Sequence, residues 1–199
     1  MFTLALDMLF PPVCVGCGCR WSAFCPNCRP RARDARALSV SGLRVYAAGH
    51  YGGSLRRAIL AYKSGRRDVG DVLAEVLGGQ VMALPPRIVL VPVPTTAGRR
   101  AERGFDQGVR LAAAVAERCD RFVLHVLRQR AGDAQRGRSR LARLGARDRF
   151  ACTHSPLLAG ANVVLVDDVV TTGSTLADCA RALRACDAAV LSAVVLAYA

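Results

Sequence analysis

Lysine, aromatic residues and long apolar runs are scarce or missing in this chain. Lys63 is the only lysine among 28 basic residues, so arginine supplies nearly all of the positive charge. Aromatic residues make up 6% of the chain, which disfavours a β-sandwich core and leaves few rings on which nucleic-acid bases could stack. No apolar run approaches the roughly 20 residues that a membrane-spanning helix needs. We therefore expect a protein without membrane insertion.

The chain has 199 residues and is 52% hydrophobic, which suits one domain with a sizeable core and a small appendage. Its apolar start lacks the basic region of a secretory signal, so we expect a cytoplasmic protein. The net charge of +13 suits phosphate-rich ligands or nucleic acid. Lys63 is either a chance outcome in a composition biased towards arginine or present for the chemistry of its compact ammonium group. The sequence does not decide between the two.

The most informative stretch of the sequence runs from residue 163 to residue 175. Four consecutive aliphatic residues predict a strand that is buried on both faces. Asp167 and Asp168 follow at the predicted carboxyl end of this strand, and a small, hydroxyl-rich loop comes next. Because a helix is expected after the loop, its free N–H groups and its dipole predict an anion site.

That helix is expected from Leu176 to Cys186. Thr175 is a good N-cap residue, and Asp178, three residues later, completes the pattern of a capping box. The adjacent pair Asp167 and Asp168 would repel a phosphate, so these carboxylates must bind another group, and vicinal hydroxyls suit them. A sugar phosphate satisfies both halves of the stretch.

The stretch resembles the phosphoribosyl pyrophosphate signature of type I phosphoribosyltransferases: a hydrophobic run, two acidic residues and a Thr/Gly/Ser loop. The resemblance implies that Asp167 and Asp168 contact the ribose hydroxyls, and that the loop binds the 5-phosphate. The loop residues are Val169, Val170, Thr171, Thr172, Gly173, Ser174 and Thr175. A Walker B strand also ends a hydrophobic run in acid, but the G-x-x-x-x-G-K-[ST] partner that it requires is missing from the sequence.

Two Cys-x-x-Cys pairs near the start of the chain predict a metal site. Cys14 and Cys17 form the first pair, and Cys25 and Cys28 form the second. In a cytosolic chain such pairs indicate zinc more often than a disulfide, and a full Cys₄ shell predicts a structural role because no coordination position stays open. A redox dithiol is the rival, but it uses one pair and leaves the other idle. Cys19 is a fifth cysteine that could compete as a ligand.

The remaining pattern predicts an α/β fold. Parallel strands are expected near 88–93, 122–127, 163–167 and 190–197, with crossover helices between them. Open sheets of this kind bind ligands at the carboxyl ends of their strands. Before these strands, the sequence predicts a strand at 43–49 and helices at 55–63 and 71–83.

Two arginine-rich segments lack a clear period. Residues 29–42 are expected to be a polar linker, and they contain Arg29, Arg31, Arg33 and Arg36. Residues 128–150 carry eight arginines, and such a charge run is typical of a solvated face or mobile loop. We expect this second segment to be mobile without ligand and to become ordered when pyrophosphate binds.

Several further motifs follow one another in a definite order. They are Pro11-Pro12-x-Cys14, both cysteine pairs, Lys63 before Gly65-Arg66, Val91-Pro92-Val93-Pro94, Arg100-x-x-Arg103-Gly104-Phe105-x-Gln107, Gln135, Arg143, Phe150 and Leu196-Ala197. With the central stretch they resemble the ComF family, in which a zinc ribbon precedes a phosphoribosyltransferase domain. The resemblance implies a ribbon and basic linker at 1–36, and a parallel-sheet type I phosphoribosyltransferase fold at 37–199. Asp106 stands where the family usually has Asn, and Ala146 where an Asn follows the arginine of the mobile arm.

The resemblance implies a protein that binds phosphoribosyl pyrophosphate with Mg²⁺ and transfers phosphoribose to an acceptor. Such a site must hold the ribose, neutralise the leaving pyrophosphate and exclude water. Asp167 and Asp168 would fix the diol. The residues expected to face pyrophosphate are Lys63, Pro94, Thr95, Arg100 and Arg103. No residue stands out as the base for an acceptor, so the acceptor, and turnover itself, stay open.

The alternative is a non-catalytic binding protein. ComF relatives are associated with DNA uptake in competent bacteria, where single-stranded DNA or a helicase partner would explain the arginines. The ligand pocket would then sense a nucleotide precursor instead of converting it. A third interpretation is a metabolic enzyme unrelated to DNA, because a fold alone fixes no pathway. The sequence leaves the oligomeric state open.

Overall fold

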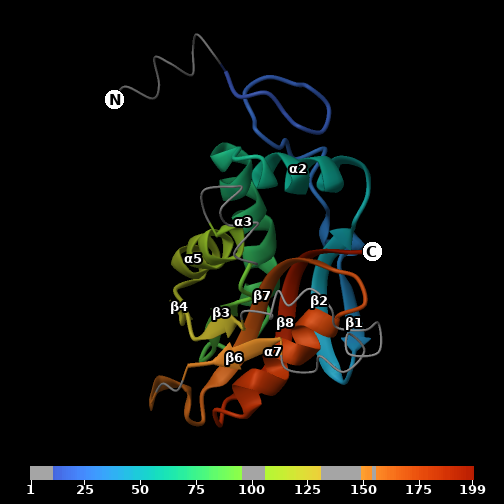
Figure 1. Cartoon of the computed structure of the whole chain (residues 1–199). Coiled ribbons are helices and arrows are strands. Elements are labelled where there is room, and N and C mark those ends of the chain that lie inside the picture. Colours follow the sequence, from blue (N-terminus) through green and yellow to red (C-terminus); the bar gives the residue numbers. More distant parts are fainter. Residues whose placement is uncertain (1–10, 96–105, 131–148, 154–155) are drawn as a thin grey trace, which may run out of the picture.

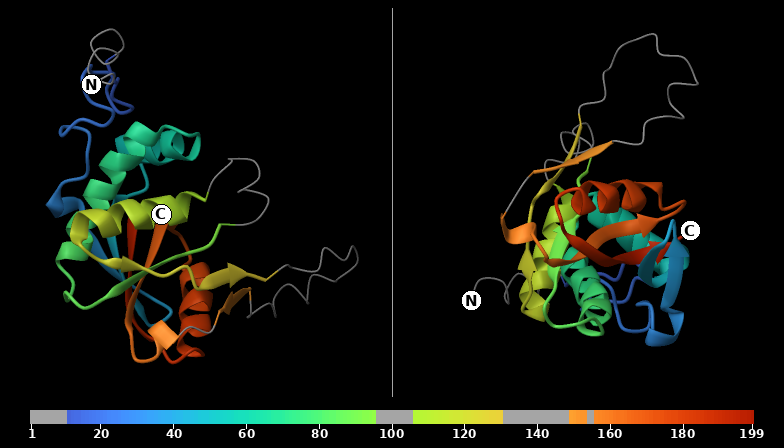
Figure 2. Two further views of the ribbon diagram at one scale, coloured as in Figure 1. Left: turned by 90° about the vertical axis from the view of Figure 1, so that its left-hand side faces the viewer. Right: turned by 90° about the horizontal axis from the view of Figure 1, so that it is seen from below.

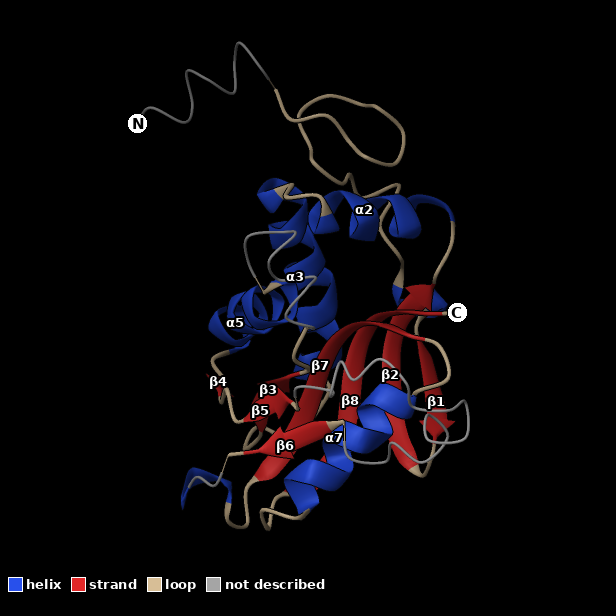
Figure 3. Cartoon of the chain, in the orientation of Figure 1, coloured by secondary structure: helices blue, strands red, loops and turns tan. Residues whose placement is uncertain are grey.

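The centre of the structure is a sheet with helices on both faces (Figure 1 and Figure 3), described in a computed structural model for residues 11–95, 106–130, 149–153 and 156–199. The strands lie in the order β1-β2-β8-β7-β3-β4. Their bounds are β1 (Arg36–Val40), β2 (Leu43–His50), β3 (Val89–Pro92), β4 (Phe122–Val123), β7 (Asn162–Val170) and β8 (Ala189–Tyr198). All neighbouring pairs in this sheet are parallel except β1 with β2. The expected α/β fold with a mostly parallel sheet is confirmed.

Helices cover both faces of the sheet (Figure 2). The helices are α2 (Gly53–Lys63), α3 (Arg67–Met82), α5 (Gln107–Cys119) and α7 (Ser174–Arg184). Val164 and Val166 of β7 belong to the core under α3 and α5, whereas Val163 and Leu165 belong to the core under α7. The aliphatic run of β7 therefore serves both faces, as its composition predicts. In the described part of the chain, no helix has the length and apolarity needed to cross a membrane.

The segment at 29–42 is not the linker that the sequence suggests. It contains the 3₁₀ helix η1 (Ala32–Asp34) and the edge strand β1. Ser41 and Gly42 join β1 to β2, and both have positive φ angles, of 50° and 77°. A two-residue turn with positive φ at both positions matches the twist of paired strands. The hairpin therefore places β1 on the free edge of β2.

The strand expected at 122–127 is wrong in its extent. β4 ends at Val123, and the next residues in extended pairing are those of β5 (Leu127–Gln129). β5 pairs antiparallel with β6 (Phe150–Cys152) in a separate two-stranded sheet. The first residue of β4, Phe122, is 80% exposed at the sheet edge, so burial does not favour a longer strand there. Most of the arginine-rich arm, residues 131–148, lies outside the described residues.

The cysteine module, residues 13–28, packs on α2. Phe24 is fully buried in the same core as the inner faces of α2 and α3. Arg57 of α2 donates to the carbonyl of Gly16 at 2.8 Å, and the Ser54 hydroxyl donates to the carbonyl of Cys28 at 2.6 Å. Burial of Phe24 and these hydrogen bonds attach the module to the helix that begins the crossover after β2.

Candidate functional site

The candidate site lies at the carboxyl ends of β3 and β7. The chain leaves β3 toward α5 on one face and leaves β7 toward α7 on the other. Parallel neighbours with connections to opposite faces open a crevice, the usual ligand site of such sheets. β3 ends at Pro92, which pairs with Val166, whereas β7 continues along β8 to Val170. Asp167 and Asp168 thus lie beyond the end of β3, and β7 extends past the predicted strand end at 167 to Val170.

Lys63 reaches this crevice from the last turn of α2. Its Nζ lies 2.7 Å from Asp168 Oδ2, and the two side chains are 21% and 23% exposed. Gln107, at the start of α5, holds this end of α2: its Nε2 donates to the Lys63 carbonyl at 2.8 Å, and its own carbonyl accepts from the Tyr62 hydroxyl at 2.9 Å. The single lysine is therefore held beside a carboxylate of the central stretch, which supports a chemical reason for its presence.

Asp167 is the less readily ionised member of the aspartate pair. Its burial, and then the charge of Asp168, raise its pKa to about 8. The Asp168 backbone N–H, which donates to Asp167 Oδ1 at 2.8 Å, and the charge of Lys63 act in the opposite direction without cancelling the rise. Burial, more than the neighbouring charge, therefore favours the protonated form of Asp167. Hydroxyl donors or a cation bound there would favour the ionised form of Asp167.

The loop after β7 ends in a helix N-terminus without a side-chain cap. Gly173 is the N-cap of α7, with a φ angle of 71°, and a Cβ atom there would lie 1.8 Å from Val40 Cγ1. Only glycine fits this position. Because Gly173 is the N-cap and α7 begins at Ser174, the expectation of Thr175 as N-cap is wrong. The first N–H groups of a helix have no intrahelical partner, and no acidic residue lies in this first turn. The predicted anion site therefore has the required local geometry.

The capping-box role expected for Asp178 is also wrong. Its carboxylate accepts from Arg149 Nε at 2.6 Å and from Arg181 Nη2 at 2.6 Å, with the Asp178 side chain only 10% exposed. Arg149 Nη2 also donates to Ser174 Oγ at 3.2 Å. Because Asp178 follows Ser174 by one helical turn, it lies on the same face of α7. An arginine just before β6 is thus tied to the first turn of α7, a contact that the sequence analysis missed.

The turn after β3 lies at the same carboxyl end of the sheet as the crevice. The Thr95 hydroxyl donates to Asp106 Oδ1 at 3.2 Å, and this oxygen also accepts a backbone N–H in the first turn of α5. Asp106 is the N-cap of α5, so an acid serves as a helix cap where the ComF family usually has an amide. Pro94 precedes Thr95 at this edge. Two residues expected to face pyrophosphate, Arg100 and Arg103, lie outside the described residues.

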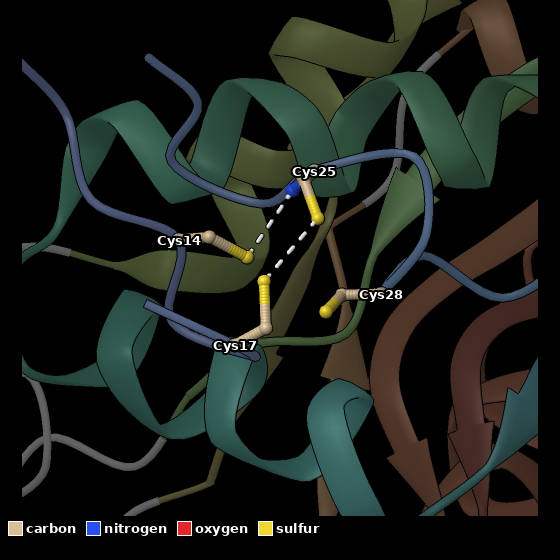
Figure 4. A group of neighbouring side chains, drawn as sticks. All are labelled: Cys14, Cys17, Cys25 and Cys28. Carbon is tan, nitrogen blue, oxygen red and sulfur yellow. Dashed lines mark hydrogen bonds between the residues drawn. The ribbon is translucent and has the colours of Figure 1, made fainter. Parts of the chain in front are cut away.

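The four cysteines of the two pairs form one cluster (Figure 4). The sulfur atoms of Cys14, Cys17, Cys25 and Cys28 all lie within 4.8 Å of one another. The Cys17 and Cys25 sulfurs are 3.7 Å apart, close to the roughly 3.8 Å edge of a tetrahedron whose metal–sulfur bonds are about 2.3 Å. The structure therefore brings together the predicted donor set, which can hold a metal ion.

Backbone donors favour a thiolate in this cluster. Burial alone would raise the pKa of Cys14, but hydrogen bonds from backbone N–H groups lower it to about 6. The N–H groups of Gly16 and Cys25 donate to Cys14 Sγ at 3.3 Å. Cys19 is not a member of the four-sulfur group. The described geometry favours the paired cysteines over Cys19 as ligands.

Known proteins resemble this chain over much of its length. The family described as phosphoribosyl transferase domain matches residues 105–199. The chain is 30% identical over 179 residues to the competence protein ComFC of Bacillus subtilis (strain 168), covering 86% of this chain and 71% of that protein. Among solved structures, the UMP synthase of Leishmania donovani matches with a TM-score of 0.38 and 14% identity. That match covers 86% of this chain but only 29% of the synthase chain.

Proposed function

Because the chain belongs to the family of the competence protein ComFC, we propose that it binds phosphoribosyl pyrophosphate with Mg²⁺ at the carboxyl ends of β3 and β7. One observation carries the proposal: Asp167 and Asp168 lie beyond the end of β3, and a short loop joins their strand to the uncapped N-terminus of α7. Carboxylates suit a ribose diol, and the helix N-terminus suits a phosphate. A ribose 5-phosphate carries both groups on one small molecule.

The 5-phosphate binds at the first turn of α7 in this proposal. Backbone N–H groups of the turn donate to it, and the hydroxyls of Thr171, Thr172 and Ser174 add further donors. Thr172, Ser174 and Thr171 are all exposed. Arg149, whose Nη2 lies 3.2 Å from Ser174 Oγ, supplies positive charge beside the phosphate. Gly173 keeps this turn open because no side chain fits at its position.

The ribose lies over the aspartate pair. Asp167 and Asp168 accept hydrogen bonds from its vicinal hydroxyls and fix the orientation of the ring. Lys63, whose Nζ lies 2.7 Å from Asp168 Oδ2, faces the pyrophosphate together with the turn at Pro94 and Thr95. These residues hold the anomeric carbon in place while the leaving group is neutralised, which is the main task of a site for this chemistry.

The side chains at the carboxyl ends of β3 and β7 suit Mg²⁺. Two adjacent carboxylates lie beside the ammonium group of Lys63 here, and Mg²⁺ favours carboxylates together with substrate phosphates and water. Asp167 and Asp168 are the carboxylates that would hold it. When bound, Mg²⁺ supplies positive charge to the departing pyrophosphate.

We assign zinc to the cysteine cluster. Cys14, Cys17, Cys25 and Cys28 provide a full thiolate shell, which suits zinc in a structural role. The metal would stabilise the cysteine module and, through the hydrogen bonds to Ser54 and Arg57, the start of α2.

The reaction that we propose is transfer of phosphoribose in the cytoplasm. The bond from the anomeric carbon to pyrophosphate breaks, pyrophosphate leaves with the electron pair, and the acceptor donates a pair to form the new bond. A thermal-shift panel with phosphoribosyl pyrophosphate, Mg²⁺ and nucleobases tests binding, since a ligand at a hundred times its Kd adds about 2.7 kcal/mol. Pyrophosphate release with one nucleobase supports transfer. No shift with phosphoribosyl pyrophosphate at millimolar concentration would reject the proposal.

A second candidate function is binding of single-stranded DNA or a helicase partner without turnover. Two observations favour it: the net charge of +13 and the similarity to a competence protein. DNA binding through phosphates weakens steeply with salt. This function would be favoured over transfer if an oligonucleotide bound in a salt-sensitive manner and no acceptor caused release of pyrophosphate from phosphoribosyl pyrophosphate.

A further inference from the structure

A separate cleft opens at the first turn of α2, at the opposite end of that helix from Lys63. Its volume is about 660 Å³, within the range of small-molecule sites. The cysteine module, η1 and the ends of β2 and β8 form its walls. Neither Lys63 nor the aspartate pair lines this cleft. The proposed phosphoribosyl pyrophosphate site therefore does not account for it.

The lining of the cleft is strongly basic. It contains Arg29, Arg31, Arg33 and Arg36 with a single carboxylate, that of Asp34. The Asp34 carboxylate accepts the backbone N–H of Arg31 at 2.7 Å, so it is committed to the local turn. These are the arginines of the segment that the sequence suggested to be a linker.

The arginines of the cleft divide into two pairs. Arg29 is fixed by a 2.9 Å ion pair with Glu75 and by a hydrogen bond to the Phe24 carbonyl. Arg36 is fixed by 2.9 Å hydrogen bonds to backbone carbonyls of the η1 turn. Arg31 and Arg33 are exposed, and no carboxylate of the described residues forms an ion pair with either guanidinium. These two arginines are available for an anion.

The start of α2 adds backbone donors to the same cleft. Gly53, Ser54 and Leu55, the first residues of this helix, line it. The N-cap residue, Gly52, has no capping side chain, and the first turn contains no acidic residue. The partial positive charge of the helix N-terminus therefore adds to that of the arginines.

We propose that this cleft binds an oligophosphate group, either free or on a nucleotide. Guanidinium groups pair with phosphate oxygens in a bidentate manner, and several of them around one cleft suit a ligand with more than one phosphate. His50 and Tyr198 also line the cleft, but their rings pack edge to face on each other with centroids 5.4 Å apart. A strand of successive bases stacks on several aromatic rings spaced along its path, whereas one ring pair lines this cleft. The lining therefore favours a small phosphorylated ligand over a nucleic-acid strand.

Calorimetry of the full chain with inorganic triphosphate tests this proposal. Arg31→Ala with Arg33→Ala should weaken binding at least about tenfold, because each change removes charge-assisted hydrogen bonds to the phosphates. Arg44→Ala with Arg87→Ala is the matched control. It removes the same charge from two exposed residues that do not line the cleft, and it should change the affinity by no more than about twofold by screening alone.

Three ligands distinguish the source of the phosphates. Equal affinity for inorganic and nucleoside triphosphate would identify the phosphate chain as the ligand, and tighter binding of the nucleoside form would add recognition of the nucleoside. A short single-stranded oligonucleotide that competes better than either would overturn the proposal. So would equal losses in the two double variants, or no triphosphate binding at millimolar concentration. None of these results depends on whether phosphoribosyl pyrophosphate binds, because the two arginines lie outside that site.

Discussion

The cysteine cluster and the aspartate pair both gather acidic groups, but their surroundings give them different roles. The four sulfurs lie within 4.8 Å of one another in a module whose Phe24 is buried in the main core. Asp167 and Asp168 lie near the carboxyl end of the central strand β7, where Lys63 forms an ion pair with Asp168. In the proposed assignments, a metal ion on the cysteines therefore supports the fold, whereas the aspartates bind a ligand. Two clusters of like charge can thus differ in role, because a metal ion would neutralise the cysteines whereas Lys63 neutralises one of the aspartates.

The largest expected effect comes from disrupting the cysteine cluster. Cys25→Ser should remove bound zinc and destabilise the cysteine module, because apparent binding free energies of structural zinc reach about 10–16 kcal/mol in small domains. Metal analysis and thermal denaturation measure the two effects. Cys19→Ser is the control and should keep stoichiometric zinc. Full zinc content in the Cys25→Ser protein would show that the ligand set is wrong.

The next largest effect tests the partner of the aspartate pair. Lys63→Met should weaken binding of phosphoribosyl pyrophosphate by roughly 10- to 100-fold, because a charged hydrogen bond contributes about 1.5–3 kcal/mol. Lys63→Arg should restore part of the affinity, since the charge returns but the compact ammonium does not. Arg67→Met, at an exposed residue nearby, is the control. Equal affinity of the Lys63→Met and wild-type proteins would remove Lys63 from the site.

A smaller effect is expected at the contact between Arg149 and α7. Arg149→Ala and Asp178→Asn should each lower the free energy of unfolding, because each removes the 2.6 Å ion pair of a carboxylate that is only 10% exposed. A double-mutant cycle measured by urea unfolding should give a coupling energy of about 1–3 kcal/mol. Arg181→Ala, at the second arginine on Asp178, should give the smaller coupling because it is more exposed. Additive losses at Arg149 and Asp178 would contradict a direct contact.

The smallest expected effect is a pH dependence from Asp167. Its pKa is about 8 in the folded protein against an ordinary value of 3.8, so the folded state holds the proton more tightly than the unfolded state. Stability should therefore fall as the pH rises from about 4 through about 8. Asp167→Asn should remove this slope, and Asp187→Asn, at an exposed residue, should keep it. Parallel pH profiles of wild type and Asp167→Asn would contradict the raised pKa.

Features that depend on local spacing could be predicted from the sequence. The buried strand at 163–166 follows from consecutive aliphatic residues, and the metal cluster follows from two Cys-x-x-Cys turns. The hairpin at Ser41 and Gly42 was also accessible, because a small residue before glycine suits a turn with positive φ angles. It was missed because the surrounding arginines suggested a linker.

Contacts between distant segments could not be predicted in this way. Arg149 and Asp178 are 29 residues apart, and no periodicity relates them, so Asp178 was assigned to a capping box. The sequence predicts that Lys63 faces pyrophosphate. Its 2.7 Å contact with Asp168 depends on where the end of α2 lies relative to β7, which the sequence does not reveal. The fold alone brings these residues together.

A calorimetric titration with phosphoribosyl pyrophosphate and Mg²⁺ tests the proposed site most directly. The wild-type protein should bind, and the Asp167→Asn, Asp168→Asn protein should bind at least about a hundredfold more weakly, since two charged acceptors of about 1.5–3 kcal/mol each are lost. The double variant should remain folded, because the mutual repulsion of the pair disappears together with the Lys63 ion pair. Unchanged affinity in a folded double variant would contradict the assignment of this edge as a ribose-phosphate site.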